Sequence, residues 1–135
     1  MPRKRLKLAP VELMLMKAVW RLGEATVQQV RDEVASERKL AYTTVLTMLR
    51  TLEQKGFLTH EERDRRYVYK PLVSEEQVGT GMLHDLLQRV FDGSPELLLT
   101  RLLEVRQLDE EELRAMKDVI RRGGRGARGK ERSDE

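Results

Sequence analysis

The first helical segment of the chain stands out because it has few polar positions. Within residues 10–22, Lys17 and Arg21 form a narrow polar stripe, so we expect a helix that is buried on most of its surface at the centre of the fold. A proline suited to a first turn opens this segment, and a glycine follows it. Its large apolar side chains are expected in the core: Met14, Met16 and Trp20.

Two further helices are predicted next. Thr26 is a favourable N-cap, and the valines that follow it at helical spacing predict a short helix over 27–35. A third helix runs from about Tyr42 to Lys55 and ends at a glycine. Its apolar side carries Val45, Met48, Leu49 and Leu52. Its opposite side carries Thr43, Thr47, Arg50 and Gln54, with Leu46 on the edge and Thr44 and Thr51 flanking.

After the third helix the pattern changes to the two-residue alternation of strands. Residues 57–62 and 66–72 are rich in aromatic and β-branched side chains and predict a β-hairpin with its tip at 63–65. Proline has no backbone N–H to donate to a neighbouring strand. Pro71 therefore predicts either that the second strand lies at a sheet edge or that Pro71 is among the last residues of that strand.

The rest of the chain is predicted to be helical. A Ser-x-x-Gln capping box at 74–77 starts a helix, and the glycines within 79–81 weaken its first turns, so we expect this segment to be mobile or to bend. A Ser-Pro-Glu sequence at 94–96 starts a leucine-rich helix, and Asp109 caps a last helix. The Gly- and Arg-rich segment from residue 121 on has too little apolar content to pack.

The net charge of +3 conceals an uneven distribution. Residues 1–73 carry a net charge of +6, residues 74–120 one of −6 and residues 121–135 one of +3. A basic region beside an acidic one favours a polyanion as the partner of the basic region alone. A solvated, salt-laced helical surface is the alternative.

Three helices followed by a β-hairpin are the element order of a winged helix, with the third helix as recognition helix and the hairpin as wing. We therefore predict a mainly α-helical fold with a small β-hairpin, in which a winged helix-turn-helix precedes a helical dimerisation region. The predicted domains are a DNA-binding domain over 1–73, the dimerisation domain over 74–122 and a disordered basic tail over 123–135.

The outward side of the third helix has the chemistry of a DNA-reading surface. A solvated helix side usually carries Glu and Lys, whereas this one offers threonine hydroxyls, an arginine and a glutamine. Arg50 can form a bidentate pair with guanine or contact a phosphate, and Leu46 can contact thymine methyl groups. A purely structural role for the threonines is less favoured, because threonine is a mediocre helix former.

Basic side chains elsewhere suit contacts with the DNA backbone. The wing tip carries three arginines: Arg63, Arg65 and Arg66. They suit backbone or minor-groove contacts, with Asp64 as a local counterion, and a solvated turn is the alternative. We expect Lys55 to lie closer to the phosphates, and the basic segments 3–7 and 121–130 to add only nonspecific attraction.

Several linked motifs carry a family resemblance. They are Leu8-x-x-x-Glu12-x-x-x-Met16-Lys17-x-Val19-Trp20, Ala25-Thr26-Val27-x-x-Val30, Thr43-Thr44-Val45-x-Thr47-x-Leu49-x-x-Leu52-x-x-Lys55-Gly56 and Tyr67-Val68-Tyr69-x-Pro71-Leu72-Val73-Ser74. In these motifs the chain resembles the penicillinase-repressor (BlaI/MecI) family. The resemblance implies a cytoplasmic, homodimeric winged-helix repressor that binds palindromic double-stranded operator DNA. It places recognition-helix contacts on Thr43, Thr44 and Thr47, and the wing arginine on Arg65.

A dimer would give the second half of the chain its role. One winged helix reads only a few base pairs, so useful specificity needs two copies on half-sites about one or two helical turns apart. The apolar side chains there exceed what two short helices can bury, so we expect an isologous, helix-swapped interface. Packing of these side chains back onto the first domain is the alternative. The expected interface residues are Leu97, Leu98, Leu99, Leu102, Leu103, Leu113, Met116 and Ile120.

Departures from the family concern how repression ends. Copper-responsive relatives carry a C-terminal cysteine cluster, and this chain has no cysteine, which closes that metal-sensing route. Repressors under β-lactam sensors are cleaved by a membrane metalloprotease at an Asn-Phe bond, where this chain has Arg101-Leu102. Either the protease differs or induction works another way. We still expect cleavage within the segment Leu99, Thr100, Arg101 and Leu102, which would split the dimer interface.

The sequence predicts no catalytic, metal or cofactor site. His60 and His84 stand on different elements, and there is neither a His/Cys cluster nor a Gly-rich phosphate loop. No stretch approaches the roughly 20 apolar residues of a membrane span, so no membrane insertion is expected. Two other functions stay open. A winged-helix protein-interaction module would need an apolar patch on the third helix, and a ligand-responsive regulator would need a pocket between helical arms.

Overall fold

The computed structural model describes residues 7–123, which divide into two units. The first unit reaches Arg89 and the second begins at Val90. The first unit therefore includes most of α4 (Glu75–Val90), a helix that the charge pattern assigns to the second region of the chain. Residues 3–6 and the tail beyond Gly123, both predicted to be basic arms, lie outside the described residues.

Three helices of the first unit surround a core. They are α1 (Pro10–Leu22), α2 (Val27–Val34) and α3 (Tyr42–Gln54), as the hydrophobic periodicity predicts. The predicted N-cap of α2 is present: Thr26 Oγ1 accepts a hydrogen bond from the Gln29 N–H at 3.1 Å. The helices bury their apolar faces against one another and against the sheet. Fully buried core residues are Leu15, Met16, Val19, Val30, Val34, Val45, Leu49, Leu52, Phe57 and Tyr69.

A three-stranded antiparallel sheet completes the first unit. Its order is β1 (Ala25–Thr26), β3 (Arg66–Pro71) and β2 (Leu58–Arg63), so β3 is the central strand. The edge-strand alternative for the proline is therefore wrong, because Pro71 is instead the last residue of the central strand. The strand β1 was not predicted, because two residues are too few to show an alternation.

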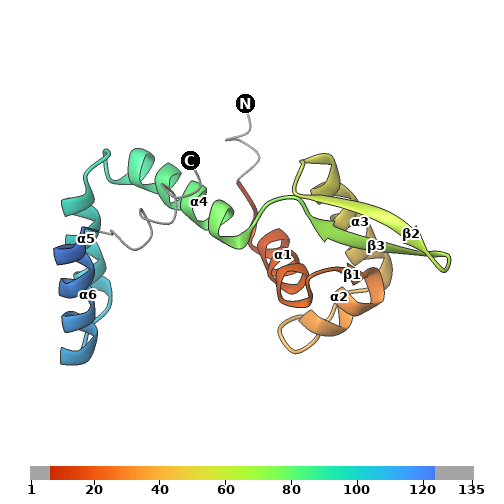
Figure 1. The fold of residues 1–135 in the computed structure, drawn as a ribbon, viewed down its shortest axis with the longest axis horizontal. Helices are drawn as coiled ribbons and strands as arrows, with labels where there is room; N and C mark the ends of the chain where they lie inside the picture. The colour runs from red at the N-terminus through yellow and green to blue at the C-terminus, as the bar shows by residue number, and fades with distance from the viewer. Residues whose placement is uncertain (1–6, 124–135) are drawn as a thin grey trace. The chain divides into compact units, whose positions relative to one another are not determined.

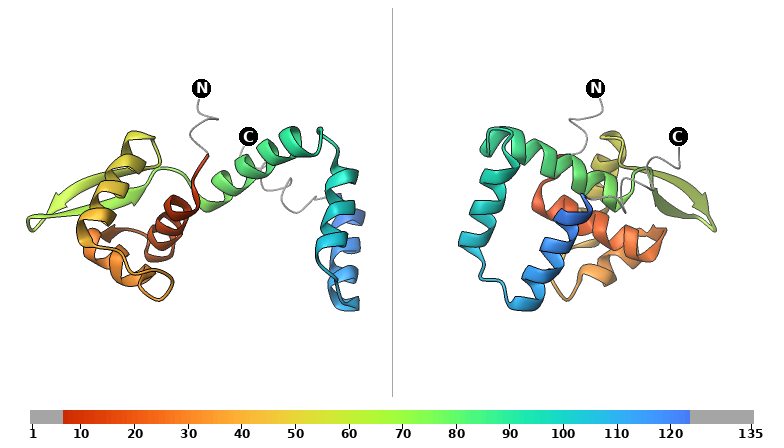
Figure 2. Two further views of the ribbon diagram at one scale, coloured as in Figure 1. Left: turned by 180° about the vertical axis from the view of Figure 1, so that it is seen from behind. Right: turned by 60° about the vertical axis from the view of Figure 1, so that its left-hand side comes forward.

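The wing tip is a two-residue turn with an unusual backbone. Asp64 and Arg65, between β2 and β3, have positive φ angles of 51° and 66°. Positive φ at both central residues matches the right-handed twist of the flanking strands, but it is costly for any residue with a side chain. The hairpin projects beyond α2 and α3 (Figures 1 and 2). The tip therefore places arginine side chains well away from the core.

Helix α4 starts where the capping box predicts. The Ser74 Oγ accepts a hydrogen bond from the Gln77 N–H at 3.0 Å, and Gln77 Oε1 accepts one from the Ser74 N–H at 2.8 Å. The indole N–H of Trp20 donates to the Val73 carbonyl at 2.9 Å, and Val78 is buried. The first turn of α4 is thus attached to the first unit. The helix continues through its two glycines without a break in its assignment.

The second unit contains α5 (Pro95–Val105) and α6 (Glu110–Arg122), which follow one another through a short loop (Figure 2). Both predicted caps are formed, because Ser94 accepts a hydrogen bond from the Leu97 N–H and Asp109 accepts one from the Glu112 N–H. Neither helix has a buried residue. The second unit thus has regular helices without a core of its own.

Candidate nucleic-acid interface

The side of α3 that faces away from the core carries the predicted contact residues. Val45, Leu49 and Leu52 are buried beneath it, so the helix can rotate very little about its axis. The hydroxyl of Thr51 donates to the Thr47 carbonyl at 3.1 Å. Exposed to solvent are Thr43, Thr44, Thr47, Arg50 and Gln54, and Leu46 is half-buried. The predicted division of α3 into an apolar and a polar side is confirmed.

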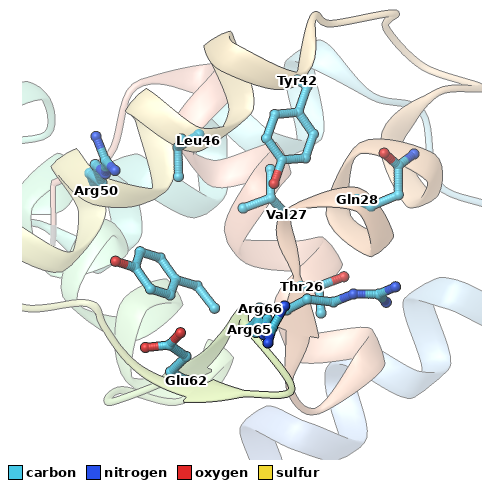
Figure 3. Close-up of a pocket in the computed structure, with 10 residues that line it drawn as sticks. Thr26, Val27, Gln28, Tyr42, Leu46, Arg50, Glu62, Arg65 and Arg66 are labelled. Atoms are coloured by element: carbon cyan, nitrogen blue, oxygen red, sulfur yellow. The ribbon is translucent and has the colours of Figure 1, made fainter.

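A groove of about 550 Å³ lies beside this face, between α3, the start of α2 and the wing (Figure 3). Its lining comes from three segments: Thr26, Val27 and Gln28; Tyr42, Leu46 and Arg50; Glu62, Arg65, Arg66 and Tyr67. The fold thus brings together residues of the recognition helix and the wing that lie far apart in the sequence. Of the predicted contact residues, those that do not line the groove are Thr43, Thr44, Thr47, Gln54 and Arg63.

Several residues of the groove were not predicted from the sequence. Tyr42 lies one helical turn before Leu46 and two before Arg50, so the periodicity of α3 could have indicated it. Tyr67 pairs with Glu62 across the hairpin, a register that the sequence pattern leaves open. The contribution of Thr26 and Gln28 depends on how α2 packs beside α3, for which the sequence has no local signal.

The groove is positively charged. Arg50, Arg65 and Arg66 line it, against one carboxylate, that of Glu62 (Figure 3). Among the ion pairs formed by residues 7–123, none includes any of these three arginines. Guanidinium groups that are not neutralised by the protein are available to phosphates and to base edges. The groove therefore has the electrostatics of a polyanion site.

Arg63 differs from its neighbours at the wing. Its guanidinium donates to Glu24, at 2.5 Å, and to Glu61. These hydrogen bonds hold the pKa of both carboxyl groups below the ordinary value, and they raise the pKa of Arg63. Within the described part of the chain the partners of Arg63 are therefore Glu24 and Glu61, and not Asp64 as expected. Arg63 thus attaches the wing to the segment before β1.

Lys55 is also engaged within the protein. Its Nζ lies 2.7 Å from Glu12 Oε2, and the other Glu12 oxygen accepts the Ala9 N–H at 3.0 Å. Burial by itself would raise the pKa of Glu12, but the hydrogen bonds from Lys55 and Ala9 outweigh burial and lower it. Lys55, expected near the phosphates, is instead joined to the start of α1. This ion pair fixes the C-terminal end of the recognition helix.

The chain is similar in sequence to known proteins over most of its length. The family model described as penicillinase repressor matches residues 8–122. The chain belongs to this family. It is 32% identical to the transcriptional regulator BlaI of Mycobacterium tuberculosis over 79% of each chain, and 27% identical to the penicillinase repressor of Bacillus licheniformis over 84% of this chain and 89% of that one. Among solved structures, the solution structure of the DNA-binding domain of the repressor BlaI matches at 30% identity, with a TM-score of 0.47, over 51% of this chain and 84% of that one.

Membership of the family makes the chain a DNA-binding transcriptional repressor of the winged-helix class, and not an enzyme. It confirms the predicted fold class, a mainly helical fold with a small antiparallel sheet. Between residues 7 and 123 the repressor has no group of three or more His, Cys, Asp or Glu side chains arranged to hold a metal ion. In that same stretch, no helix has the length and apolar character needed to cross a membrane.

His60 of the repressor is satisfied within the protein. Its Nδ1 lies 2.7 Å from Glu53 Oε1, and its ring centroid is 4.5 Å from that of Tyr67 and 5.4 Å from that of Tyr69. The His60 ring therefore has a carboxylate partner on α3 and aromatic neighbours on β3. This contact joins β2 to the recognition helix.

The leucines of the second unit are incompletely covered. Leu102 and Leu103 are exposed, as is Ile120 with 62% of its surface accessible. The remaining predicted interface residues are half-buried: Leu97, Leu98, Leu99, Leu113 and Met116. Val105 and Val119, which were not predicted, are also exposed. Taken by itself, the second unit therefore presents an apolar surface on α5 and α6.

Proposed function

We propose that the repressor acts in the cytoplasm as a homodimer that binds a palindromic operator, each copy reading one half-site with α3 and its wing. The observation that supports this most directly is the groove between α3 and the wing. Arg50, Arg65 and Arg66 line it and form no ion pair among the described residues, while the face of α3 presents hydroxyls and a half-buried leucine. Such a surface can contact phosphates, base edges and thymine methyl groups together.

In this proposal the contact residues divide by task. Arg50 and the exposed threonines of α3, Thr43, Thr44 and Thr47, read bases in the major groove, with Leu46 and Gln54 beside them. Arg65 and Arg66 contact the backbone or the minor groove. Arg63 orients the wing through its two carboxylate partners, and its contribution to DNA binding is indirect.

Dimerisation is supported by the uncovered apolar surface of α5 and α6. Isolated short helices are marginally stable in water, and burial of an apolar face supplies most of the stability of a helix in a protein. A second copy that presents the same surface would cover both sets of leucines in an isologous interface. The dimer would also link two recognition helices and so extend the DNA sequence that is read.

DNA binding is tested with the full chain and duplexes selected from a random library. The selected DNA should be an inverted repeat, and the chain should bind it more tightly than a scrambled duplex of equal length, with a steep dependence on salt. Replacement of Arg50 by alanine should reduce this preference by roughly 1 to 3 kcal/mol if Arg50 reads a base. Arg114→Ala on α6, an exposed arginine outside the groove, is the matched control and should leave the preference unchanged. An unchanged preference in Arg50→Ala contradicts the assignment of Arg50.

Relief of repression is proposed to involve cleavage near Leu99 to Leu102 by a membrane sensor metalloprotease. These residues lie in the middle of α5, where the hydroxyl of Thr100 donates to the Glu96 carbonyl and Arg101 pairs with Glu104. A protease needs an extended segment, and a helix without a buried core opens at low cost. Cleavage would remove part of the apolar surface and separate the half-site readers.

Mass spectrometry of the repressor from induced cells tests this step. Fragments that end within residues 99–102, together with loss of operator binding, are the expected result. Intact chain that has lost operator binding would contradict cleavage and would favour the ligand-responsive alternative. A Leu102→Pro variant, which disrupts α5 at the same position, should bind the operator weakly without cleavage.

A further inference from the structure

The hydroxyl of Tyr69 is the one buried side-chain polar atom, within the part of the chain that the structure describes, that has no hydrogen-bond partner. Tyr69 lies on β3, the central strand of the sheet, and the residue has no exposed surface. A hydroxyl that is buried without a partner lowers stability, so phenylalanine would suit the core better at this position. The presence of tyrosine therefore points to a role outside the packing of the core.

Two charged side chains of the recognition helix act on this hydroxyl. Burial raises the pKa of Tyr69, Glu53 raises it further, and the Arg50 guanidinium lowers it. The carboxylate of Glu53 is already bound, because it faces His60 Nδ1 at 2.7 Å and 3.0 Å. Arg50 is exposed and has no ion-pair partner among residues 7–123. Its guanidinium lies near enough to the Tyr69 hydroxyl to lower the pKa of Tyr69 by hydrogen bonding, but the two groups do not have the geometry of a complete hydrogen bond. Arg50 is therefore the group that is free to meet the hydroxyl.

The chemistry of the two groups is complementary. A guanidinium carries five N–H donors in a rigid fork, and a bidentate contact with guanine uses only two of them. When DNA covers Arg50 and removes its water, the remaining N–H groups need acceptors, and a phenolic oxygen is one. The aromatic ring of Tyr69 is held in place by the core and by the neighbouring ring of His60, at a centroid distance of 5.4 Å. The acceptor is thus fixed before DNA arrives.

We propose that Tyr69 is a positioning residue for Arg50: on DNA binding its hydroxyl accepts a hydrogen bond from the guanidinium and holds the fork in the orientation that reads a base. This inference rests on the proposed function, because it requires the face of α3 to lie against the operator. Tyr69 itself does not touch DNA. It affects specificity through Arg50, because an acceptor that is already in place lowers the entropy cost of ordering a long side chain on binding.

The test is Tyr69→Phe in the full chain, with binding measured for the selected inverted repeat and for a scrambled duplex. The ratio of the two affinities should fall about tenfold, the size expected for a hydrogen bond to a charged group. The thermal unfolding midpoint should stay the same or rise, because the variant removes an unpartnered hydroxyl. Thr59→Val also removes a hydroxyl from a strand of the same sheet, at a position that does not line the groove, and should leave the ratio unchanged.

A double variant shows whether Tyr69 acts through Arg50. In an Arg50→Ala background, Tyr69→Phe should have no further effect on the affinity ratio. An unchanged affinity ratio in Tyr69→Phe overturns the inference, and so does an equal loss with and without Arg50. The proposed function still stands in either case if the parent chain prefers the inverted repeat and Arg50→Ala does not. If the parent chain itself fails to prefer the inverted repeat, the proposed function falls, and the inference falls with it.

Discussion

The two units of the repressor place similar apolar side chains in very different surroundings. In the first unit Leu15, Leu49 and Phe57 have no exposed surface, whereas in the second unit no residue of α5 or α6 is buried. The helices of both units are regular and most have side-chain caps, so local helix formation does not distinguish them. The difference lies in tertiary burial, which is the main source of stability. We therefore expect the first unit to fold as a single chain and the second to require a second copy.

The charged groups follow the same division. In the first unit the Glu12 carboxylate is nearly buried, with 8% of the residue exposed, and Lys55 neutralises it. In the second unit the pairs Arg101–Glu104 and Arg121–Asp118 join neighbouring turns of one helix on the surface. Exposed pairs of this kind contribute little to stability. Arg106 at the end of α5 also pairs with Glu112 of α6 at 2.7 Å. Charge pairing in the second unit therefore lies on its surface, whereas in the first unit it also neutralises a buried carboxylate.

The largest expected effect separates the two units by their leucines. Leu49→Ala removes a fully buried side chain of α3 and should lower the free energy of unfolding of the first unit by about 3 kcal/mol. Leu102→Ala, the same change at an exposed position of α5, should leave that transition unchanged. Urea unfolding of both variants at low protein concentration, followed by circular dichroism, makes the comparison. Equal losses in the two variants would contradict a division of the chain by burial.

The next largest effect concerns the stability of the first unit at low pH. The pKa of Glu12 is held below its ordinary value of 4.5, so its carboxylate stabilises the first unit above that pH, and this stabilisation is lost as the pH falls below it. Glu12→Gln should cost about 1.5 kcal/mol at neutral pH and should make unfolding of the first unit less sensitive to acid. The measurement is the unfolding midpoint as a function of pH.

Glu112 on α6 provides the matched control for this titration. Hydrogen bonds from Arg106 and from the Asp109 N–H also lower the pKa of Glu112, but 37% of its side chain is exposed, against 10% for Glu12. Glu112→Gln should leave the acid unfolding of the first unit unchanged. The same pH dependence in both variants would show that Glu12 has no special role.

A smaller effect tests the second unit directly. Leu103 on α5 is 44% exposed and Leu22 on α1 is 41% exposed, so the two side chains are matched in accessibility. Leu103→Asp should weaken dimerisation at least about tenfold, or about 1.4 kcal/mol, because it buries a charge in the proposed interface. Leu22→Asp should leave it unchanged. Sedimentation equilibrium at several concentrations measures both, and unchanged association in Leu103→Asp would argue against the interface.

The smallest effect separates stability from DNA binding within the first unit. Arg65 has a φ of 66°, a conformation that glycine adopts without strain, so Arg65→Gly should raise stability by about 0.5 kcal/mol. The same variant should weaken DNA binding, because one phosphate contact is lost. The slope of the logarithm of the binding constant against the logarithm of the salt concentration should become shallower by about one. Arg66→Ala should weaken binding without the gain in stability. A destabilised Arg65→Gly would show that the turn is not strained.

Most of the elements of the first unit follow from local patterns in the sequence. The bounds of α1, α2 and α3 and the caps at Thr26 and Ser74 agree with the predictions, because helical periodicity and capping depend only on residues a few positions apart. The hairpin was predicted for the same reason. The strand β1 was missed because its two residues are recognisable as a strand only once they pair with Tyr69 and Val68.

The candidate site was predicted in part. The exposed face of α3 follows from its periodicity, but the groove also takes Thr26 and Tyr67 from segments that fold against it. The partners of the wing and helix cations were not predictable, because Arg63 and Glu24 lie 39 positions apart, and Lys55 and Glu12 lie 43 positions apart. Which charges meet depends on how the chain crosses itself.

What the sequence by itself determined was the order of the helices and strands, the polar face of α3 and the excess of leucine in α5 and α6. These properties are local, since they arise from the spacing and chemistry of neighbouring residues. Only the tertiary structure decided that Arg50, Arg65 and Arg66 share one groove while Arg63 and Lys55 are bound within the protein. Packing brings distant charges into contact or keeps them apart, and the Coulomb energy of a pair depends on that distance and on its exposure to water.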